Sequence, residues 1–150
     1  HYMMVTIDTC NNFCEIVGNM AKDYILLTFV DGKTIHDLFV ENNIAHNQSW
    51  EYHDGTIQKY KLTRLYDTDE LMPAGQRIGV KLPFSNDIIE EYLVNIEYII
   101  SRLETMGWKV LEHKTALDFK DDVVENNTEK MKKEDLINLS CYHAIAFSRL

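Results

Sequence analysis

The order of apolar and polar residues changes along the chain, and its first part has the spacing of helices around a buried strand. Over Ile7–Ala21 the apolar side chains recur at steps of three and four residues, which predicts a helix. Tyr24–Val30 is then almost continuously apolar, the pattern of a strand buried on both faces of a parallel sheet. Asp31-Gly32 supplies a turn, and Lys33–Glu41 again has helical spacing. This order predicts an α/β sheet.

The middle of the chain alternates polar and apolar residues with the period of strands. Three segments show the alternation: Ser49–His53, Thr56–Leu65 and Gln76–Pro83. Asp54-Gly55 and Pro73–Gly75 supply turn residues between them, so we expect an antiparallel ribbon inserted into the α/β sheet. The alternation of Tyr52, Tyr60 and Tyr66 marks either one apolar face of this ribbon or a platform on which bases stack.

The last part of the chain returns to helical spacing. Asp87 is a helix-capping residue type, and the periodic run Ile88–Met106 behind it predicts a long helix that ends at Gly107. A strand, a charged helix and a final strand are expected after it: Trp108–His113, residues 120–138 and Ser140–Ser148. No repeat, low-complexity tract or linker interrupts this order, so the simplest interpretation is a single domain.

The composition excludes several classes of protein. Apolar residues make up 45% of the chain and charged residues 26%, as in globular domains. No segment approaches the roughly 20 apolar residues of a membrane span, and no signal peptide begins the chain. The net charge of −9 argues against a surface that grips long nucleic acid by its phosphates. A pocket for one nucleotide, or a basic partner, stays open.

The sulfur and imidazole side chains indicate no metal site. Cys10, Cys14 and Cys141 are an odd and sparse set, which indicates a reducing compartment and no disulfide framework. No second Cys or His pair completes a site with Cys10 and Cys14, so buried small side chains are the better interpretation. The remaining candidates have no ligand-like spacing and are expected at surface or packing positions: His36, His46, His53, His113 and His143. Trp50 and Trp108 are expected as hydrophobic anchors.

The sheet that these elements predict lacks its first strands. The Tyr24–Val30 strand needs neighbours on both sides, and sheets of this type normally begin with strands that precede the first visible helix. No glycine-rich nucleotide turn, P-loop, HExxH or GxSxG motif occurs. We therefore expect residues 1–150 to be the carboxyl-terminal part of one larger α/β domain, cut immediately before His1.

Five segments in a fixed order carry a specific resemblance: His1-Tyr2, Thr28–Gly32, Glu91–Val94, Lys114–Phe119 and Tyr142–Phe147. Together they resemble the second half of an mRNA cap guanine-N7 methyltransferase, and they span nearly the whole chain. The ending Phe147-Ser-Arg149 looks most like the capping enzymes of large DNA viruses, in which the methyltransferase is the last domain of a multifunctional polypeptide. The chain departs from cellular members at Val30, where they often carry proline. Only the last two residues of the family's Gln-Phe-x-x-His-Tyr segment are present.

The resemblance implies a fold, a cofactor and partners. The fold is the carboxyl-terminal half of a class I, Rossmann-like methyltransferase sheet with an inserted antiparallel ribbon. The cofactor is S-adenosylmethionine, bound mostly by residues upstream of this chain. The expected partners are the capped 5′ end of mRNA, the missing amino-terminal part of the domain and a capping-enzyme partner subunit, with no membrane involved. A viral protein of this kind would work in the cytoplasm, in a viral factory or the virion.

Glu91 is the main candidate for a catalytic and cap-binding residue. The guanine N7 already carries a lone pair, so methylation needs alignment and electrostatic complementarity rather than a general base. One carboxylate can accept hydrogen bonds from both the N1–H and the N2–H₂ of guanine. The alternative is a solvated glutamate near a helix N-terminus, stabilised by the helix dipole, and the neighbouring Glu90 is expected to be of that solvated kind.

Three further residues enter the predicted pocket by resemblance. Tyr142 would pack against the guanine, and an aromatic face suits a cationic methylated base; the alternative is a tyrosine of a core or surface strand. His1 would contact the guanine and Tyr2 would lie between guanine and cofactor, although a frayed terminus is the alternative for His1. Two functions stay open: an enzyme fragment, or a catalytically inactive methyltransferase-like scaffold in a capping complex.

Overall fold

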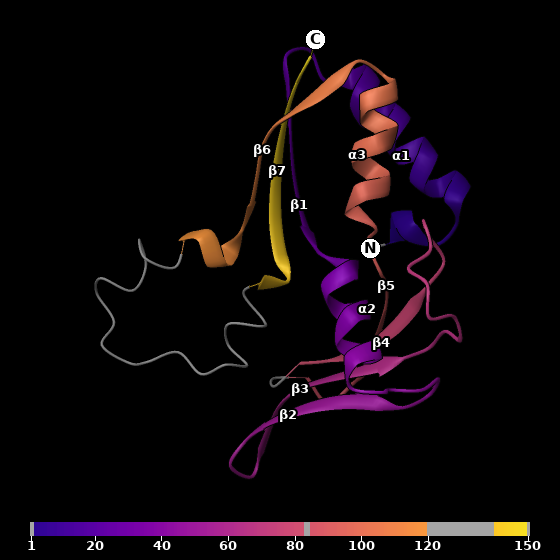
Figure 1. The fold of residues 1–150 in the computed structure, drawn as a ribbon, viewed down its shortest axis with the longest axis vertical. Coiled ribbons are helices and arrows are strands. Elements are labelled where there is room, and N and C mark those ends of the chain that lie inside the picture. The colour runs from indigo at the N-terminus through magenta and orange to yellow at the C-terminus, as the bar shows by residue number, and fades with distance from the viewer. Residues whose placement is uncertain (1, 83–84, 120–139, 150) are drawn as a thin grey trace. The chain divides into compact units, whose positions relative to one another are not determined.

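A computed structural model of the chain describes residues 2–82, 85–119 and 140–149. Its internal contacts divide the chain into two compact units, each assembled from segments far apart in the sequence (Figure 1). The first unit holds the residues up to Cys10 and Gly32–Asn95, and the second holds Asn11–Asp31 and Ile96–Leu150. Both contain helices and strands, which confirms a mixed α/β fold. In the described ranges, no helix has the length and apolar character needed to cross a membrane.

The second unit is built on a three-stranded sheet of order β1-β7-β6. The strands are β1 (Tyr24–Val30), β6 (Trp108–Thr115) and β7 (Tyr142–Arg149). β7 runs antiparallel to both of its neighbours, so β1 and β6 are parallel to each other. The three predicted strands are therefore confirmed, with β6 extending beyond its predicted end. The helix predicted over residues 120–138 lies outside the described residues.

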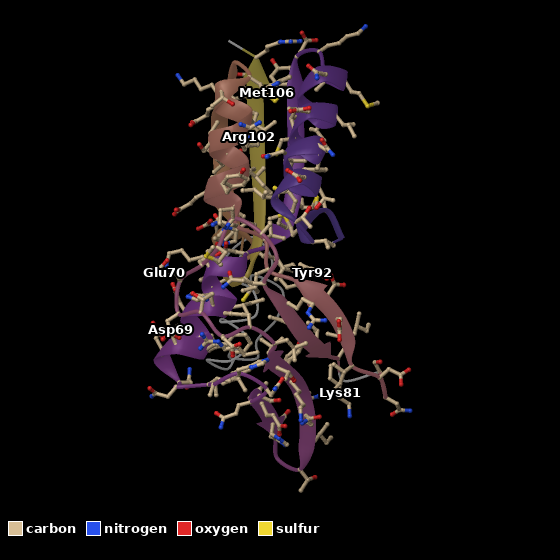
Figure 2. All side chains as sticks on the ribbon, turned by 90° about the vertical axis from the view of Figure 1, so that its right-hand side faces the viewer. Asp69, Glu70, Lys81, Tyr92, Arg102 and Met106 are labelled. Atoms are coloured by element: carbon tan, nitrogen blue, oxygen red, sulfur yellow. The ribbon has the colours of Figure 1, made fainter. Side chains whose placement is uncertain are left out.

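Two helices cover one face of this sheet. Figures 1 and 2 show α1 (Ile7–Met20), whose first turn belongs to the first unit, side by side with α3 (Ile96–Thr105). Trp108 of β6 is buried, and its indole N–H donates to the Gly18 carbonyl of α1 at 3.2 Å. Trp108 is thus the hydrophobic anchor expected from the sequence, and its one polar atom is satisfied.

The expectation that β1 is buried on both faces of a parallel sheet is wrong for the described residues. Its neighbour β7 is antiparallel, and its other edge is unpaired in the described part of the chain. Ile25 and Phe29 are buried under the helices, whereas Tyr24 and Leu26 on the other face are 73% and 72% exposed. A continuous apolar run shows that both faces of the strand carry apolar side chains, but it does not show whether the second face is covered or by which segment.

The first unit contains a four-stranded antiparallel sheet of order β2-β3-β4-β5. Its strands are β2 (Ser49–Asp54), β3 (Ile57–Arg64), β4 (Arg77–Lys81) and β5 (Ile89–Tyr92). The helix α2 (Gly32–Glu41) and the short 3₁₀ helix η1 (Tyr2–Met4) belong to the same unit. The predicted antiparallel ribbon is confirmed, and β5 adds a strand that the sequence pattern did not show.

The long helix predicted over Ile88–Met106 is wrong in its first half. Ile89–Tyr92 forms β5, and the helix α3 begins only at Ile96 and ends at Thr105. The isoleucine and the tyrosine of β5 favour a strand once a neighbour is present to pair with, and β4 is that neighbour. Asn95 stands directly before the helix, where asparagine is a preferred cap. Gly107, with φ of +85°, follows the helix as predicted.

Gly32 is required by a close approach of two backbones within the first unit. Its N–H donates to the Val94 carbonyl at 2.9 Å. A Cβ added at Gly32 would lie 2.6 Å from the Val94 oxygen and 2.7 Å from the Val94 nitrogen. The glycine that follows Asp31 therefore has a structural explanation, because it lets the start of α2 pack against the segment directly after β5.

We predict that Gly32→Ala destabilises the protein by about 1–3 kcal/mol, because the added methyl group can be accommodated only if two backbone segments move apart. Urea unfolding measures this cost. Lys33 is the next residue of the same helix and is exposed. Lys33→Ala should therefore change stability by no more than about 0.5 kcal/mol. Equal stability of the two variants would show that the backbones are not in contact here.

Candidate functional site

Glu91 lies on the buried face of the four-stranded sheet. In the strand register it is opposite Ile78, which is in turn opposite Arg64. Residues paired across antiparallel strands point to the same face, and Arg64 and Ile78 are 5% and 3% exposed. The Glu91 side chain is half-buried on that face. The alternative of a solvated glutamate near a helix N-terminus is therefore wrong, because Glu91 belongs to a strand.

Glu90 occupies the opposite face of the same strand. It pairs across the sheet with Gly79, and its carboxylate lies 3.3 Å from Nη1 of Arg77. Both members of this ion pair are exposed, so the expectation of a solvated Glu90 is confirmed. Two adjacent carboxylates of one strand thus have different surroundings.

Backbone contacts hold β5 in place at several points of the first unit. The short helix η1, which begins at Tyr2, lies against β5. The Gly75 N–H donates to the Met4 carbonyl at 2.8 Å, and the Leu93 N–H donates to the Gln76 carbonyl at 2.9 Å. The structure therefore brings the backbone of the Tyr2 segment next to the strand of Glu91. His1 and the side chain of Tyr2 lie outside the described residues.

A buried hydrogen-bond chain fixes the loop that follows β3. His36 Nε2 lies 3.1 Å from the Asp69 carbonyl, which can only accept, so Nε2 carries the proton. In a neutral ring Nδ1 then accepts from the Tyr66 hydroxyl at 2.9 Å. Burial raises the pKa of Tyr66 to about 12, which keeps this hydroxyl protonated. Tyr66 is therefore a core residue and not part of a stacking platform, and Figure 2 shows Asp69 beside α2.

Tyr52 and Tyr60 are paired across β2 and β3, and their rings stack with centroids 6.3 Å apart and planes at 13°. Both rings are half-buried. Tyr60 is four residues before Arg64 on the same strand, so the alternation of side chains places this pair on the sheet face of Glu91. The predicted one-sided aromatic face is thus confirmed for these two tyrosines.

Tyr142 begins β7 at one edge of the second unit's sheet. It is opposite Val30, the last residue of β1, and its side chain is 48% exposed. The carboxyl ends of the parallel strands β1 and β6 lie at this same edge, where ligands of open α/β sheets bind. The Asp31 N–H donates to the Cys141 carbonyl at 2.6 Å and so joins the end of β1 to the start of β7. Tyr142 and Glu91 belong to different units.

The segment Lys114–Phe119 has a structural explanation at this edge. Asp118 accepts from the Thr115 N–H at 2.6 Å, and the Asp118 N–H donates to Thr115 Oγ1 at 3.3 Å. These reciprocal bonds are a capping box at the start of the 3₁₀ helix η2 (Ala116–Phe119). The bonds that the Thr115 N–H and the Thr115 hydroxyl donate to the Asp118 carboxylate lower the pKa of Asp118.

Two histidines meet beside Tyr142. His113 Nε2 lies 2.8 Å from His143 Nδ1, and the ring centroids are 4.9 Å apart. Burial, and then the charge of His143, lower the pKa of His113. The sequence predicted only surface or packing positions for both. They are 30 residues apart, and only the pairing of β6 with β7 brings them together.

The described residues hold no metal-binding cluster. No group of three or more His, Cys, Asp or Glu side chains in the described ranges is placed to bind an ion. Cys10, Cys14 and Cys141 are reduced and buried, which confirms that the first two are buried small side chains. Burial and the nearby Asp31 carboxylate raise the pKa of Cys141 to about 11, so it is a thiol at neutral pH.

Comparison with known proteins shows a distant similarity to viral mRNA-capping enzymes. No protein-family model matches the chain. It is 30% identical over 131 residues to the mRNA-capping enzyme of African swine fever virus isolate Pig/Kenya/KEN-50/1950, a match that covers 85% of this chain and 15% of the relative. The homologue from isolate Tick/South Africa/Pretoriuskop Pr4/1996 is 31% identical over 122 residues, 79% of this chain and 14% of the relative.

The chain therefore spans about a seventh of the length of the curated relatives that it matches. Among solved structures, an S-adenosylmethionine-dependent methyltransferase from Clostridium acetobutylicum ATCC 824 aligns with 97% of this chain and 53% of its own. The TM-score is 0.45 and the sequence identity 11%.

We predict that iodoacetamide at pH 8 leaves all three cysteines of the folded protein unmodified. All are buried, and the raised pKa of Cys141 leaves little thiolate there. Intact-mass spectrometry before and after unfolding in guanidinium measures this, with full labelling expected only after unfolding. Rapid labelling of Cys141 in the native protein would contradict the described packing at the start of β7.

Proposed function

We propose that this chain is the carboxyl-terminal part of an mRNA cap guanine-N7 methyltransferase domain and supplies most of its cap-guanine pocket. In this reaction the N7 lone pair takes the methyl group of S-adenosylmethionine. N7 has no proton to lose, so the residues of the chain would act by positioning the guanine and complementing its charge.

The position of Glu91 is the observation that carries the proposal. Its side chain lies half-buried in a row with Arg64 and Ile78, on a strand that pairs with β4 and is followed by a backbone bond from Leu93 to Gln76. A carboxylate there only accepts hydrogen bonds, and the N1–H and N2–H₂ of guanine are adjacent donors. Such charge-assisted bonds are stronger than neutral ones. The negative charge would also complement the positive charge that develops on the ring as N7 is methylated.

Tyr142 would supply an aromatic surface to the same substrate. Its half-exposed ring lies at the carboxyl edge of the second unit's sheet, and aromatic faces attract cationic ligands such as a methylated guanine. In this proposal His1 contacts the guanine and Tyr2 lies between the guanine and the cofactor. The position of η1 against β5 supports this role of the Tyr2 segment.

The sequence comparisons support the choice of reaction. The match to mRNA-capping enzymes covers most of this chain, and five motif-like segments occur in the order of the methyltransferase family. The uncovered surface of the second unit supports a larger domain. The edge of β1 is unpaired within the described residues, and Tyr24 and Leu26 expose apolar side chains beside it. We propose that the remainder of the domain covers this edge and face.

The described residues do not by themselves fit S-adenosylmethionine. The turn that leads from β1 into α2, Asp31-Gly32, is engaged in the fold. Its Gly32 N–H donates to Val94, and its Asp31 N–H donates to Cys141. A nucleotide-binding turn needs such N–H groups for the ligand. The cofactor would therefore be held by residues beyond the described ones.

We predict that the 150-residue chain alone does not bind S-adenosylmethionine measurably, because no such turn is available in its described part. Isothermal titration calorimetry tests this at protein concentrations of tens of micromolar. Micromolar affinity would show that the cofactor site lies within this chain, and the proposed division of the domain would be wrong.

We predict that Glu91→Gln and Glu91→Ala in the full-length polypeptide each lower kcat/KM for a capped RNA by about 100-fold or more. Alanine removes both acceptor oxygens, whereas glutamine keeps one acceptor but loses the negative charge and places an amide donor against a guanine donor. Transfer of a radioactive methyl group measures this. Glu90→Gln is the matched control, since Glu90 pairs with exposed Arg77 on the other face, and its activity should stay within about threefold of wild type.

If kcat/KM of Glu91→Ala for the capped RNA stayed within a few-fold of wild type, the proposed role of Glu91 would be wrong. A wild-type polypeptide that binds its capping partners but transfers no methyl group would instead favour the inactive scaffold.

A further inference from the structure

The side chain of His143 forms a hydrogen bond to the Ser140 carbonyl, so the bond spans Tyr142 and closes the turn before β7. Its Nε2 lies 3.0 Å from the Ser140 carbonyl, three residues earlier in the chain. The Asp31 N–H donates to the Cys141 carbonyl between them. The two carbonyls that directly precede Tyr142 are therefore each held by a donor.

The protonation of the two histidines follows from this network. The Ser140 carbonyl can only accept, so His143 Nε2 must carry hydrogen. A neutral His143 then presents a lone pair at Nδ1, and His113 Nε2 donates to it at 2.8 Å. The hydrogen positions are assigned by these partners. His113 therefore fixes the ring of His143 in the orientation that reaches Ser140.

The backbone clamp holds the residues from which the Tyr142 side chain departs. The side chain is about half exposed, so burial alone does not select its rotamer. Tyr142 is also the first residue of β7, so strand pairing fixes the backbone that follows it but not the backbone that precedes it. The register of β1 with β7 places Tyr142 on the sheet face of Tyr24 and Leu26. A clamp on residues 140 and 141 would hold the Tyr142 backbone, and with it the Cα–Cβ direction, on that face at the carboxyl end of β1.

We propose that His143, oriented by His113, is a positioning residue for Tyr142 in the cap-guanine pocket. The inference rests on the proposed function. We call the His113–His143 pair the histidine clamp. The histidine clamp does not contact the reacting atoms. It acts on the affinity for the capped RNA.

The histidine clamp accepts one proton but not two. With one added proton, an N–H still points at a lone pair; with two, both facing nitrogens carry hydrogen and the rings repel. The charged groups around it are Asp31 after β1, Asp118 of η2 and Lys114 of β6, with the Cys141 thiol neutral. The first two favour the first proton, whereas burial opposes charge on His113. The second proton must be taken up against the lowered pKa of His113, so the clamp opens at a pH below the ordinary histidine value of about 6.5.

Steady-state methylation of a capped RNA by the full-length polypeptide tests the proposal. We expect His143→Ala to raise KM for the capped RNA about tenfold, the effect of one lost hydrogen bond on binding, while KM for S-adenosylmethionine stays unchanged. His143→Gln should restore most of this affinity, because its amide nitrogen can donate to Ser140. His53→Ala, an exposed histidine of the first unit, is the control and should have no effect.

The pH profile supplies a second readout. Affinity of the wild type for the capped RNA should fall as pH drops below about 6.5, and His113→Gln, which donates but does not titrate, should move this acid limb to lower pH. Two results would overturn the positioning role alone, provided that the wild-type polypeptide methylates capped RNA. One is an unchanged KM for the capped RNA in His143→Ala, and the other is an equal loss of affinity in the alanine and glutamine variants. A wild-type polypeptide that methylates no capped RNA would overturn the proposed function and this inference together.

Discussion

The pairing of β5 with β4 is the constraint on which the account of the first unit depends. A strand places neighbouring side chains on opposite faces, so this register sends Glu91 to the face of Arg64 and Ile78 and sends Glu90 to the exposed face. A slip by one residue would exchange the two carboxylates. The contact of β5 with η1 opposes such a slip, and so do the backbone bonds of Leu93 and Val94, directly after β5, to Gln76 and to Gly32 of α2.

The second unit places its candidate residues by topology. Because β7 lies between two parallel strands and runs against them, its first residue comes to the edge where those strands end. The pairing of β6 with β7 brings His113 next to His143, which directly follows Tyr142. The capping box of Thr115 and Asp118 and the bond from Asp31 to Cys141 hold the same edge together.

Much of the fold was predictable because its signals are local. Helical spacing gave α1 and α2, alternation gave β2, β3 and β4, and Gly107 marked the end of α3. β5 was missed because its isoleucine and tyrosine also fit a helical repeat, and only pairing with β4 makes the segment a strand. Buried Tyr66 and the histidine clamp were missed for the same reason, since hydrogen bonds between segments 30 residues apart leave no local pattern.

The most direct test of the central claim is a structure of the full-length polypeptide with a guanine cap analogue and S-adenosylhomocysteine. The account predicts both Glu91 carboxylate oxygens within hydrogen-bond distance of the guanine N1 and N2, with the Tyr142 ring against the base. A guanine bound away from β5, or a Glu91 side chain that points away from the base, would contradict it.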